Sequence, residues 1–243
     1  MGTSRDLASD LRPPDRGGRS GGLAYALWLP GSAPPWPGVV ILHGAGSRKE
    51  NHADFAARAA SMGWAALAFD QRGHGRSDGR MGPGALRDAA AMAALLAGVE
   101  GVSPGGVCVR GSSMGGFMAI LAAAAQAEIA GAIAICPAEG ALLAAGLRAG
   151  ALDFEADRNA LGDWLERQDL LAAAAAIGPR PLMLQHAEGD VQVPIAGTRR
   201  LFEAALEPKR LVEVPGGDHR SVQHDPGLQA LSLAWTAEAL GLA

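Results

Sequence analysis

The chain contains 243 residues, 49% of them hydrophobic, and carries a formal net charge of −4 at pH 7. This length favours one large domain with a sizeable buried core. The acidic balance and the lack of a basic stripe argue against a nucleic-acid partner.

The sequence shows no sign of a membrane segment or an export signal. No apolar stretch is long and uninterrupted enough to predict a membrane span, and residues 1–10 lack the apolar core of a signal peptide. Cys108 and Cys136 lie in apolar, strand-like segments, which favours two buried free thiols in a reducing compartment over a disulfide. We therefore expect a cytoplasmic protein without a membrane partner.

Strands and helices are predicted to alternate along the chain. Residues 1–22 are polar and rich in Arg, Gly and Pro, and are predicted to be a flexible lead-in to a domain over 23–243. The predicted strands are residues 23–29, 39–42, 64–69, a segment leading to residue 111, 129–136, 181–184 and 211–214. The predicted helices are residues 50–62, 86–96, an Ala-rich helix ending at 125, 196–206 and 228–240. This alternation predicts an α/β fold with a mostly parallel sheet and helices on both faces.

The pattern Gly-x-Ser-x-Gly, typical of a nucleophile elbow, occurs at three places. At residues 18–22 no strand precedes it, and at 75–79 the glycines and proline that follow prevent an immediate helix. Only residues 111–115 have a predicted strand before them and a helix after them. Ser113 would then stand at the apex of a strained turn, beside the N–H groups of a helix N-terminus. It is the candidate nucleophile.

Two further candidates follow predicted strand ends. Asp190 comes after the strand at 181–184, and His219 comes after the strand at 211–214. Ligand sites of parallel sheets form outside the carboxyl ends of the strands, so these residues are expected to meet Ser113. A serine needs a base within hydrogen-bond reach, which His219 would supply, while Asp190 would orient the imidazole.

The order Ser, Asp, His is the one that the α/β-hydrolase fold uses. The chain resembles the α/β-hydrolase superfamily over roughly residues 23–240. Besides the elbow, the resemblance is carried by His-Gly-Ala-Gly at 43–46, Asp-Gln-Arg-Gly-His-Gly-Arg-Ser at 70–77, Gly-Asp and Val-Pro within 189–194, and Gly-Asp-His at 217–219. It implies a mostly parallel sheet of about eight strands, helices on both faces, and a short cap insert at about 138–177. The compact size and Ser-Met-Gly-Gly resemble the small serine esterase and dienelactone-hydrolase branch, although serine rather than cysteine at the elbow weakens the latter assignment.

Each member of the proposed triad has a rival in the sequence. His224 lies five residues after His219 and is expected on the surface before the last helix. Glu188 is too near the strand, and Asp218 would point away from the ring of its neighbour His219. The family usually has His-Gly before the acid, where this chain has His-Ala at 186–187; this departure affects packing more than chemistry.

The resemblance also implies an oxyanion hole and a pocket. The backbone N–H groups of Met114 and Ala45 would bind the oxyanion. The Leu-rich cap insert suggests an apolar wall, and His43, Trp164 and Leu143 are the predicted pocket residues. Of the other candidates, His74 is expected to be structural or pocket-lining, Asp70 a structural hydrogen-bonding residue, and His52 and His186 surface or packing residues.

Neither a metal nor another cofactor is expected, because the six histidines are scattered and no metal-binding or dinucleotide-binding spacing occurs. We predict a carboxylesterase-type serine hydrolase that cleaves carboxylic esters of small to medium acyl or alkyl groups through an acyl-enzyme. The same triad would serve a thioesterase, an amidase or an acyl-peptidase, and a non-catalytic ligand-binding protein of this fold is the alternative from another class. The expected partner is a small-molecule ester, and a homodimer is left open.

Overall fold

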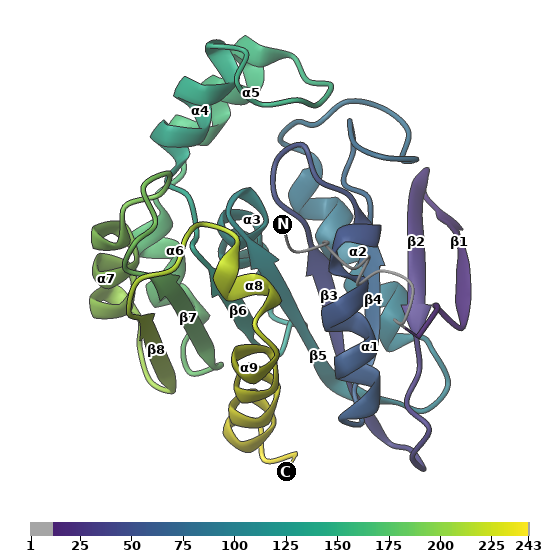
Figure 1. The fold of residues 1–243 in the computed structure, drawn as a ribbon. Coiled ribbons are helices and arrows are strands. Elements are labelled where there is room, and N and C mark those ends of the chain that lie inside the picture. The colour runs from purple at the N-terminus through teal and green to yellow at the C-terminus, as the bar shows by residue number, and fades with distance from the viewer. Residues whose placement is uncertain (1–11, 243) are drawn as a thin grey trace, which may run out of the picture.

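A computed structural model describes residues 12–242 of the chain (Figure 1). One sheet of eight strands runs through this part of the molecule in the order β1-β2-β4-β3-β5-β6-β7-β8. Strands β1 and β2 pair antiparallel, as do β2 and β4, and all other neighbours are parallel. The strands are β1 (Arg16–Ser20), β2 (Leu23–Trp28), β3 (Trp36–Leu42), β4 (Ala65–Phe69), β5 (Val102–Ser112), β6 (Ala132–Ile135), β7 (Leu182–Ala187) and β8 (Lys209–Val214).

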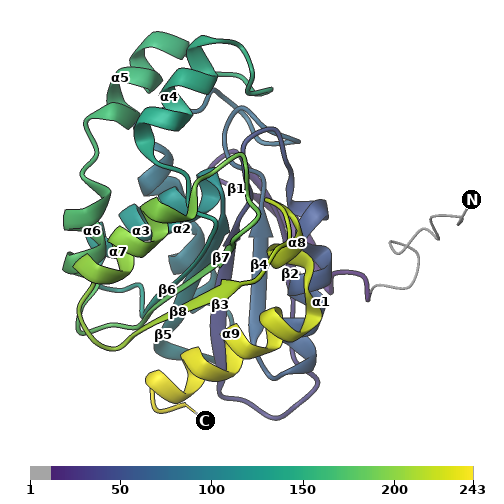
Figure 2. The same ribbon diagram turned by 60° about the vertical axis from the view of Figure 1, so that its left-hand side comes forward.

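Helices cover both faces of the sheet. Helices α1 and α9 lie on one face, and α2, α3, α6 and α7 lie on the other (Figures 1 and 2). The helices are η2 (Lys49–His52, a 3₁₀ turn), α1 (Ala53–Ser61), α2 (Ala85–Ala97), α3 (Met114–Ala125), α4 (Gly140–Arg148), α5 (Arg158–Glu166), α6 (Leu170–Ile177), α7 (Ile195–Ala204), α8 (Ser221–His224) and α9 (Pro226–Ala239). The predicted mostly parallel sheet with helices on both faces is confirmed.

The centre of the sheet is buried on both sides. Every residue of β4 is buried, as are the last five residues of β3, and both strands are continuous apolar runs. Such runs suit parallel strands that are covered by helices on each face. Helix α3 is buried from Met114 to Ala123, which explains why it is apolar all around rather than amphipathic.

The prediction that residues 1–22 form a flexible lead-in is wrong for residues 16–20. Residues Arg16–Ser20 form β1, which pairs antiparallel with β2 at the edge of the sheet. This strand is mostly exposed and contains two glycines, so it has no apolar alternation by which the sequence could reveal it. The part of the prediction that falls on residues 1–11 lies outside the described residues.

The segment predicted as a cap contains three helices. Helices α4 and α5 stand above the carboxyl ends of the strands, whereas α6 lies back against the body beside α7 (Figures 1 and 2). Asp157 and Asp169 accept hydrogen bonds from the backbone N–H groups of Ala160 and Ala172, and so cap the N-termini of α5 and α6. Among residues 12–242, no helix has both the length and the apolar character needed to cross a membrane.

Candidate active site

Ser113 joins β5 to α3 in a backbone conformation that side chains rarely adopt. Its φ is 55° and its ψ is −118°. The Ser113 N–H donates to the carbonyl of Ile135 over 2.9 Å, and its carbonyl accepts from the N–H of Phe117 over 3.1 Å. Conformations of this kind cost about 1–3 kcal/mol and persist where the surroundings hold them. The neighbouring strand and the first turn of α3 hold this one, as the elbow pattern predicted.

The glycines on either side of Ser113 allow three backbone segments to meet. A Cβ atom on Gly111 would overlap the carbonyl of Gly115, and a Cβ atom on Gly115 would overlap the carbonyl of Leu42 at the end of β3. These close approaches leave no room for a side chain at either position. The two glycines of the pattern are therefore required by backbone packing, which places Ser113 where β3 and β5 both end.

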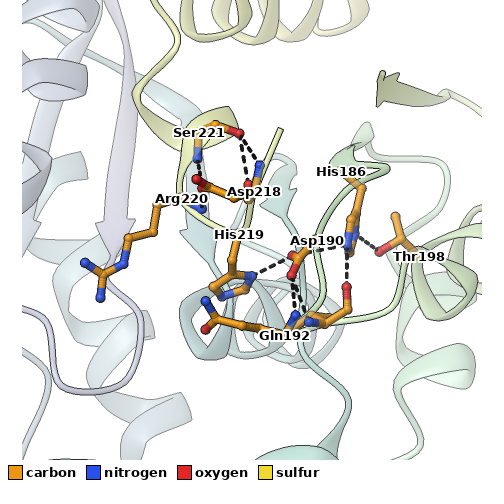
Figure 3. Close-up of polar contacts among 9 residues, drawn as sticks. His186, Asp190, Gln192, Thr198, Asp218, His219, Arg220 and Ser221 are labelled. Carbon is orange, nitrogen blue, oxygen red and sulfur yellow. Dashed lines mark hydrogen bonds and ion pairs between the residues drawn. The ribbon is translucent and has the colours of Figure 1, made fainter. Parts of the chain in front are cut away.

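His219 and Asp190 contact each other beyond the ends of β8 and β7. His219 Nδ1 lies 2.6 Å from Asp190 Oδ2 (Figure 3). Asp190 Oδ1 accepts from the N–H groups of Gln192 and Val193, each over 2.9 Å. Burial by itself would raise the pKa of Asp190, but the Val193 hydrogen bond and the contact with His219 outweigh it and hold the pKa below its usual value. Asp190 is therefore ionised at neutral pH and suited to orient the imidazole.

The rivals in the sequence have partners of their own. His224 Nδ1 lies 2.9 Å from Oδ2 of Asp54, a residue of α1. The Asp218 carboxylate accepts from the N–H groups of Arg220 and Ser221 over 2.8 and 3.0 Å. Within residues 12–242, His219 contacts no carboxylate other than that of Asp190.

The two N–H groups predicted for an oxyanion hole are available. Neither the Ala45 nor the Met114 backbone N–H donates to a protein acceptor in the described part of the chain. Both residues follow strand ends, Ala45 after β3 and Met114 as the first residue of α3. Unsatisfied donors next to a candidate nucleophile suit a developing negative charge.

A cavity of about 620 Å³ contains Ser113 and His219. The two side chains share this cavity, although no hydrogen bond joins them among the described residues. Such contacts are often long in sites without substrate. The cavity is lined by Gly44, Ala45, Gly46, Ser47, Asn51, His52, Ser112, Ser113, Ala151, Leu152, Gln192, His219, Arg220, Gln223 and His224.

The predicted pocket residues are not among those lining the cavity. His43 is fully buried, where its Nε2 accepts from the Gln71 N–H over 3.0 Å and its carbonyl accepts from the Gln71 side-chain amide over 2.7 Å. Leu143 is in the hydrophobic core, and Trp164 packs edge-on against Phe117 with ring centroids 6.3 Å apart. The prediction that the cap segment forms an apolar wall of the pocket is wrong, because this segment contributes only Ala151 and Leu152 to the lining.

Known proteins share this architecture. A family model described as serine aminopeptidase, S33, matches residues 33–149, a little under half of the chain. Protein Rv2307c of Mycobacterium tuberculosis is 29% identical over 220 residues, covering 87% of this chain and 70% of the relative. The α/β hydrolase GrgF from Penicillium sp. sh18 superposes with a TM-score of 0.78 at 18% identity, covering 90% of this chain and 94% of the other. The Paleococcus ferrophilus monoacylglycerol lipase gives a TM-score of 0.70 at 20% identity, covering 91% and 99%.

The chain has the α/β-hydrolase fold, and the family model supports placing it in that superfamily. Sheet order, elbow and strand-end site all agree with this assignment. Two histidines that were not predicted at the site line the cavity, His52 and His224. His52 is buried at the end of η2, in agreement with the packing alternative of its prediction, and His224 closes α8. Neither directly follows a predicted strand end, which is the signal that selected Asp190 and His219.

The loops after β3 and β4 are joined by buried polar contacts. Asp70 accepts from the Lys49 N–H over 2.8 Å, the Lys49 ammonium over 2.7 Å and the Arg76 N–H over 2.9 Å. Burial, aided by the charge of His74, lowers the pKa of His43 to about 4, so its ring is neutral and its Nδ1–H can donate to the Gly44 carbonyl 2.8 Å away. His43 and Asp70 thus support the loop that presents Ala45.

One group of possible metal ligands occurs among the described residues: Cys136, His186 and Asp190. His186 Nδ1 lies 2.7 Å from Thr198 Oγ1, and its Nε2 lies 2.9 Å from the Val193 carbonyl (Figure 3). Burial raises the pKa of the Cys136 thiol to about 12. Both imidazole nitrogens are thus occupied and the thiol is neutral at physiological pH, which is a poor donor set for a metal ion.

Proposed function

We propose that the chain is a serine hydrolase that cleaves carboxylic esters of small to medium size through an acyl-enzyme. The observation that carries this proposal is the elbow: Ser113 has a strained backbone and lines the same cavity as His219, which contacts Asp190 at 2.6 Å. The similarity to a monoacylglycerol lipase, which is named for ester cleavage, supports the choice of esters.

The reaction would use groups that already lie at the cavity. Ser113 Oγ attacks the ester carbonyl while His219 takes the hydroxyl proton, and Asp190 stabilises the resulting imidazolium. The carbonyl oxygen becomes an oxyanion that accepts hydrogen bonds from the Ala45 and Met114 N–H groups. When the tetrahedral intermediate collapses, His219 gives its proton to the leaving alcohol. Water then attacks the acyl-enzyme, and His219 again acts as base.

The test combines turnover with covalent labelling. Hydrolysis of p-nitrophenyl esters of increasing acyl length is measured for the wild type and Ser113→Ala, and a fluorophosphonate label is located by mass spectrometry. We expect label on Ser113, and a loss of at least about 10³-fold in kcat/KM for the variant. A folded wild-type protein with neither turnover nor label would reject the proposal and favour a ligand-binding protein of this fold.

Amide hydrolysis is a second candidate, and one observation favours it. The family model that matches residues 33–149 is described as a serine aminopeptidase. The same nucleophile and base would act on a peptide bond, with the proton from His219 going to the leaving amine. Amino-acid p-nitroanilides assayed beside the p-nitrophenyl esters distinguish the two, since a peptidase would give a higher kcat/KM on the anilides.

A further inference from the structure

The cavity beside Ser113 is lined mainly by polar side chains. Among residues 12–242, its apolar side chains are Ala45, Ala151 and Leu152, and the rest of the lining is polar residues and glycine. Sites for apolar ligands are lined predominantly by hydrophobic and aromatic groups. This cavity therefore suits a polar substrate better than a long alkyl chain.

The charge carried by the described lining of the cavity is positive. No aspartate or glutamate belongs to the lining as described for residues 12–242, whereas Arg220 does. The Arg220 backbone is held by the hydrogen bond from its N–H to Asp218. Its guanidinium has no hydrogen-bond or ion-pair partner within the described part of the chain, and the side chain extends away from the Asp190–His219 pair (Figure 3).

A second arginine lies behind the cavity wall. The Arg110 side chain is 1% exposed, its Nη2 donates to the Gln223 carbonyl over 2.9 Å, and its Nη1 lies 3.5 Å from Nδ1 of His52. Its Nε has no partner, and no carboxylate among residues 12–242 forms an ion pair with it. Burial lowers its pKa to about 10, which leaves it charged at neutral pH.

Two carboxylates lie next to the cavity and contact histidines of its lining. Asp54 contacts His224 at 2.9 Å and accepts from the Gln229 side-chain amide over 2.7 Å. Asp190 contacts His219. The Asp54 carboxylate acts on Arg110 from behind this wall and partly offsets its charge, so the cation that lines the cavity without a partner among residues 12–242 is Arg220.

We propose that this cavity selects esters that carry a carboxylate close to the scissile bond, with Arg220 as its ion-pair partner. This inference rests on the proposed ester hydrolysis and names its substrate class. A guanidinium presents parallel N–H donors that match the two oxygens of a carboxylate. Arg220 and His219 line the same cavity, so an ester whose carboxylate is bound by Arg220 would lie in the cavity that holds the base.

The experiment uses pairs of esters that differ in charge and little in shape. 4-Acetoxybenzoate is compared with 4-acetoxybenzamide for a carboxylate on the alcohol side, and the mono-4-nitrophenyl ester of adipic acid with 4-nitrophenyl hexanoate for one on the acyl side. We expect kcat/KM to be about tenfold higher for the charged member of at least one pair. Arg220→Gln should remove that preference, because kcat/KM should fall about tenfold more for the charged ester than for the neutral one.

Arg210→Gln is the matched control. It removes the same charge from β8, near the end of the strand away from Ser113, and it should leave the preference intact. Turnover of all the esters without a charge preference, or an equal loss on both members in Arg220→Gln, would overturn the inference and leave the hydrolase proposal standing.

Binding separates failure of this inference from failure of the proposed function. The affinities of Ser113→Ala for the same esters are measured by calorimetry, with and without Arg220→Gln. If the wild type hydrolyses none of the esters, the hydrolase proposal fails. Tighter binding of the carboxylate esters that is lost in Arg220→Gln would then still support the carboxylate site, and equal binding of both members would overturn it.

Discussion

The candidate triad is distinguished from its rivals by how each side chain is already bonded. Asp190 receives two backbone N–H groups on one oxygen and contacts His219 with the other. Asp218 uses its carboxylate on the N–H groups of its own turn. Because the Asp190 carboxylate contacts Nδ1 of His219, it can set the tautomer of that ring. The Asp218 carboxylate is bonded to backbone N–H groups of its own turn and does not contact the ring.

Replacing Asp190 by asparagine tests this role at the scale of one residue. Asp190→Asn keeps the shape but removes the charge that stabilises the imidazolium, and an amide nitrogen facing Nδ1 would favour the wrong tautomer. We expect kcat/KM for p-nitrophenyl esters to fall by about 10³–10⁴-fold. The matched control, Asp218→Asn, retains an acceptor oxygen for the turn and should stay within a few-fold of the wild type. An Asp190→Asn variant as active as this control would exclude Asp190 as the acid.

At the scale of elements, the site depends on how closely β3, β5 and α3 approach one another. Ser113 keeps its conformation because its N–H donates to the Ile135 carbonyl in β6 and its carbonyl accepts from the Phe117 N–H in the first turn of α3. The close packing of α3 against β3 at Gly115 makes this geometry possible. The elbow therefore depends on the packing of β3, β5 and α3, although residues 111–115 are enough to recognise it in the sequence.

Gly115→Ala measures that dependence. The new methyl group would overlap the Leu42 carbonyl, a backbone atom that can move only with β3. We expect the free energy of unfolding to fall by about 1–3 kcal/mol, and activity to fall more than stability explains, because α3 must shift. Urea unfolding and ester turnover provide the measurements. Gly82→Ala is the control, since nothing lies within 4 Å of its added Cβ; equal stability of the two variants would contradict the packing argument.

At the scale of the whole molecule, contacts between the two ends of the chain shape one side of the site. Asp54 in α1 contacts His224 in α8 and accepts from Gln229 in α9. Arg58, also in α1, donates to the Gln229 side-chain oxygen over 2.9 Å. These contacts fix the C-terminal segment that contributes Arg220, Gln223 and His224 to the cavity.

The Asp54 contacts predict a loss of stability in acid. Burial raises the pKa of Asp54, but the hydrogen bonds from His224 and Gln229 outweigh it and lower the pKa to about 2 from a usual value near 3.8. Because the folded state has the lower pKa, the carboxylate stabilises the fold above about pH 4, and this contribution disappears as the pH falls from 4 towards 2. Asp54→Asn should therefore lose less stability than the wild type over that range.

Urea unfolding at pH 5 and at pH 3 measures this difference. Asp163→Asn, which removes an exposed carboxylate that pairs with Arg148 on the cap segment, is the control and should follow the wild type. Parallel loss of stability in the wild type and Asp54→Asn would show that the contact between α1 and the C-terminal helices does not depend on the charge of Asp54.

The sequence by itself determined the features that depend on a few consecutive residues. The alternation of strands and helices, the elbow at Ser113 and the positions of Asp190 and His219 after their strands all come from local patterns, because turn chemistry and burial of a strand act over short distances. Strand β1 could not be predicted in this way, since an exposed edge strand with two glycines has no periodicity to detect.

Only the tertiary structure decided which side chains line the cavity. His52, Gln192 and the pair Arg220 and Gln223 come from three segments far apart in the chain, and no local pattern indicates that their side chains share a cavity with Ser113. Of the predicted pocket residues, Leu143 and Trp164 pack in or against the hydrophobic core, and His43 is hydrogen-bonded to the backbone of Gln71. The polar character of the pocket follows from how the β3 loop and the C-terminal turn face each other, and that arrangement depends on packing across the whole sheet.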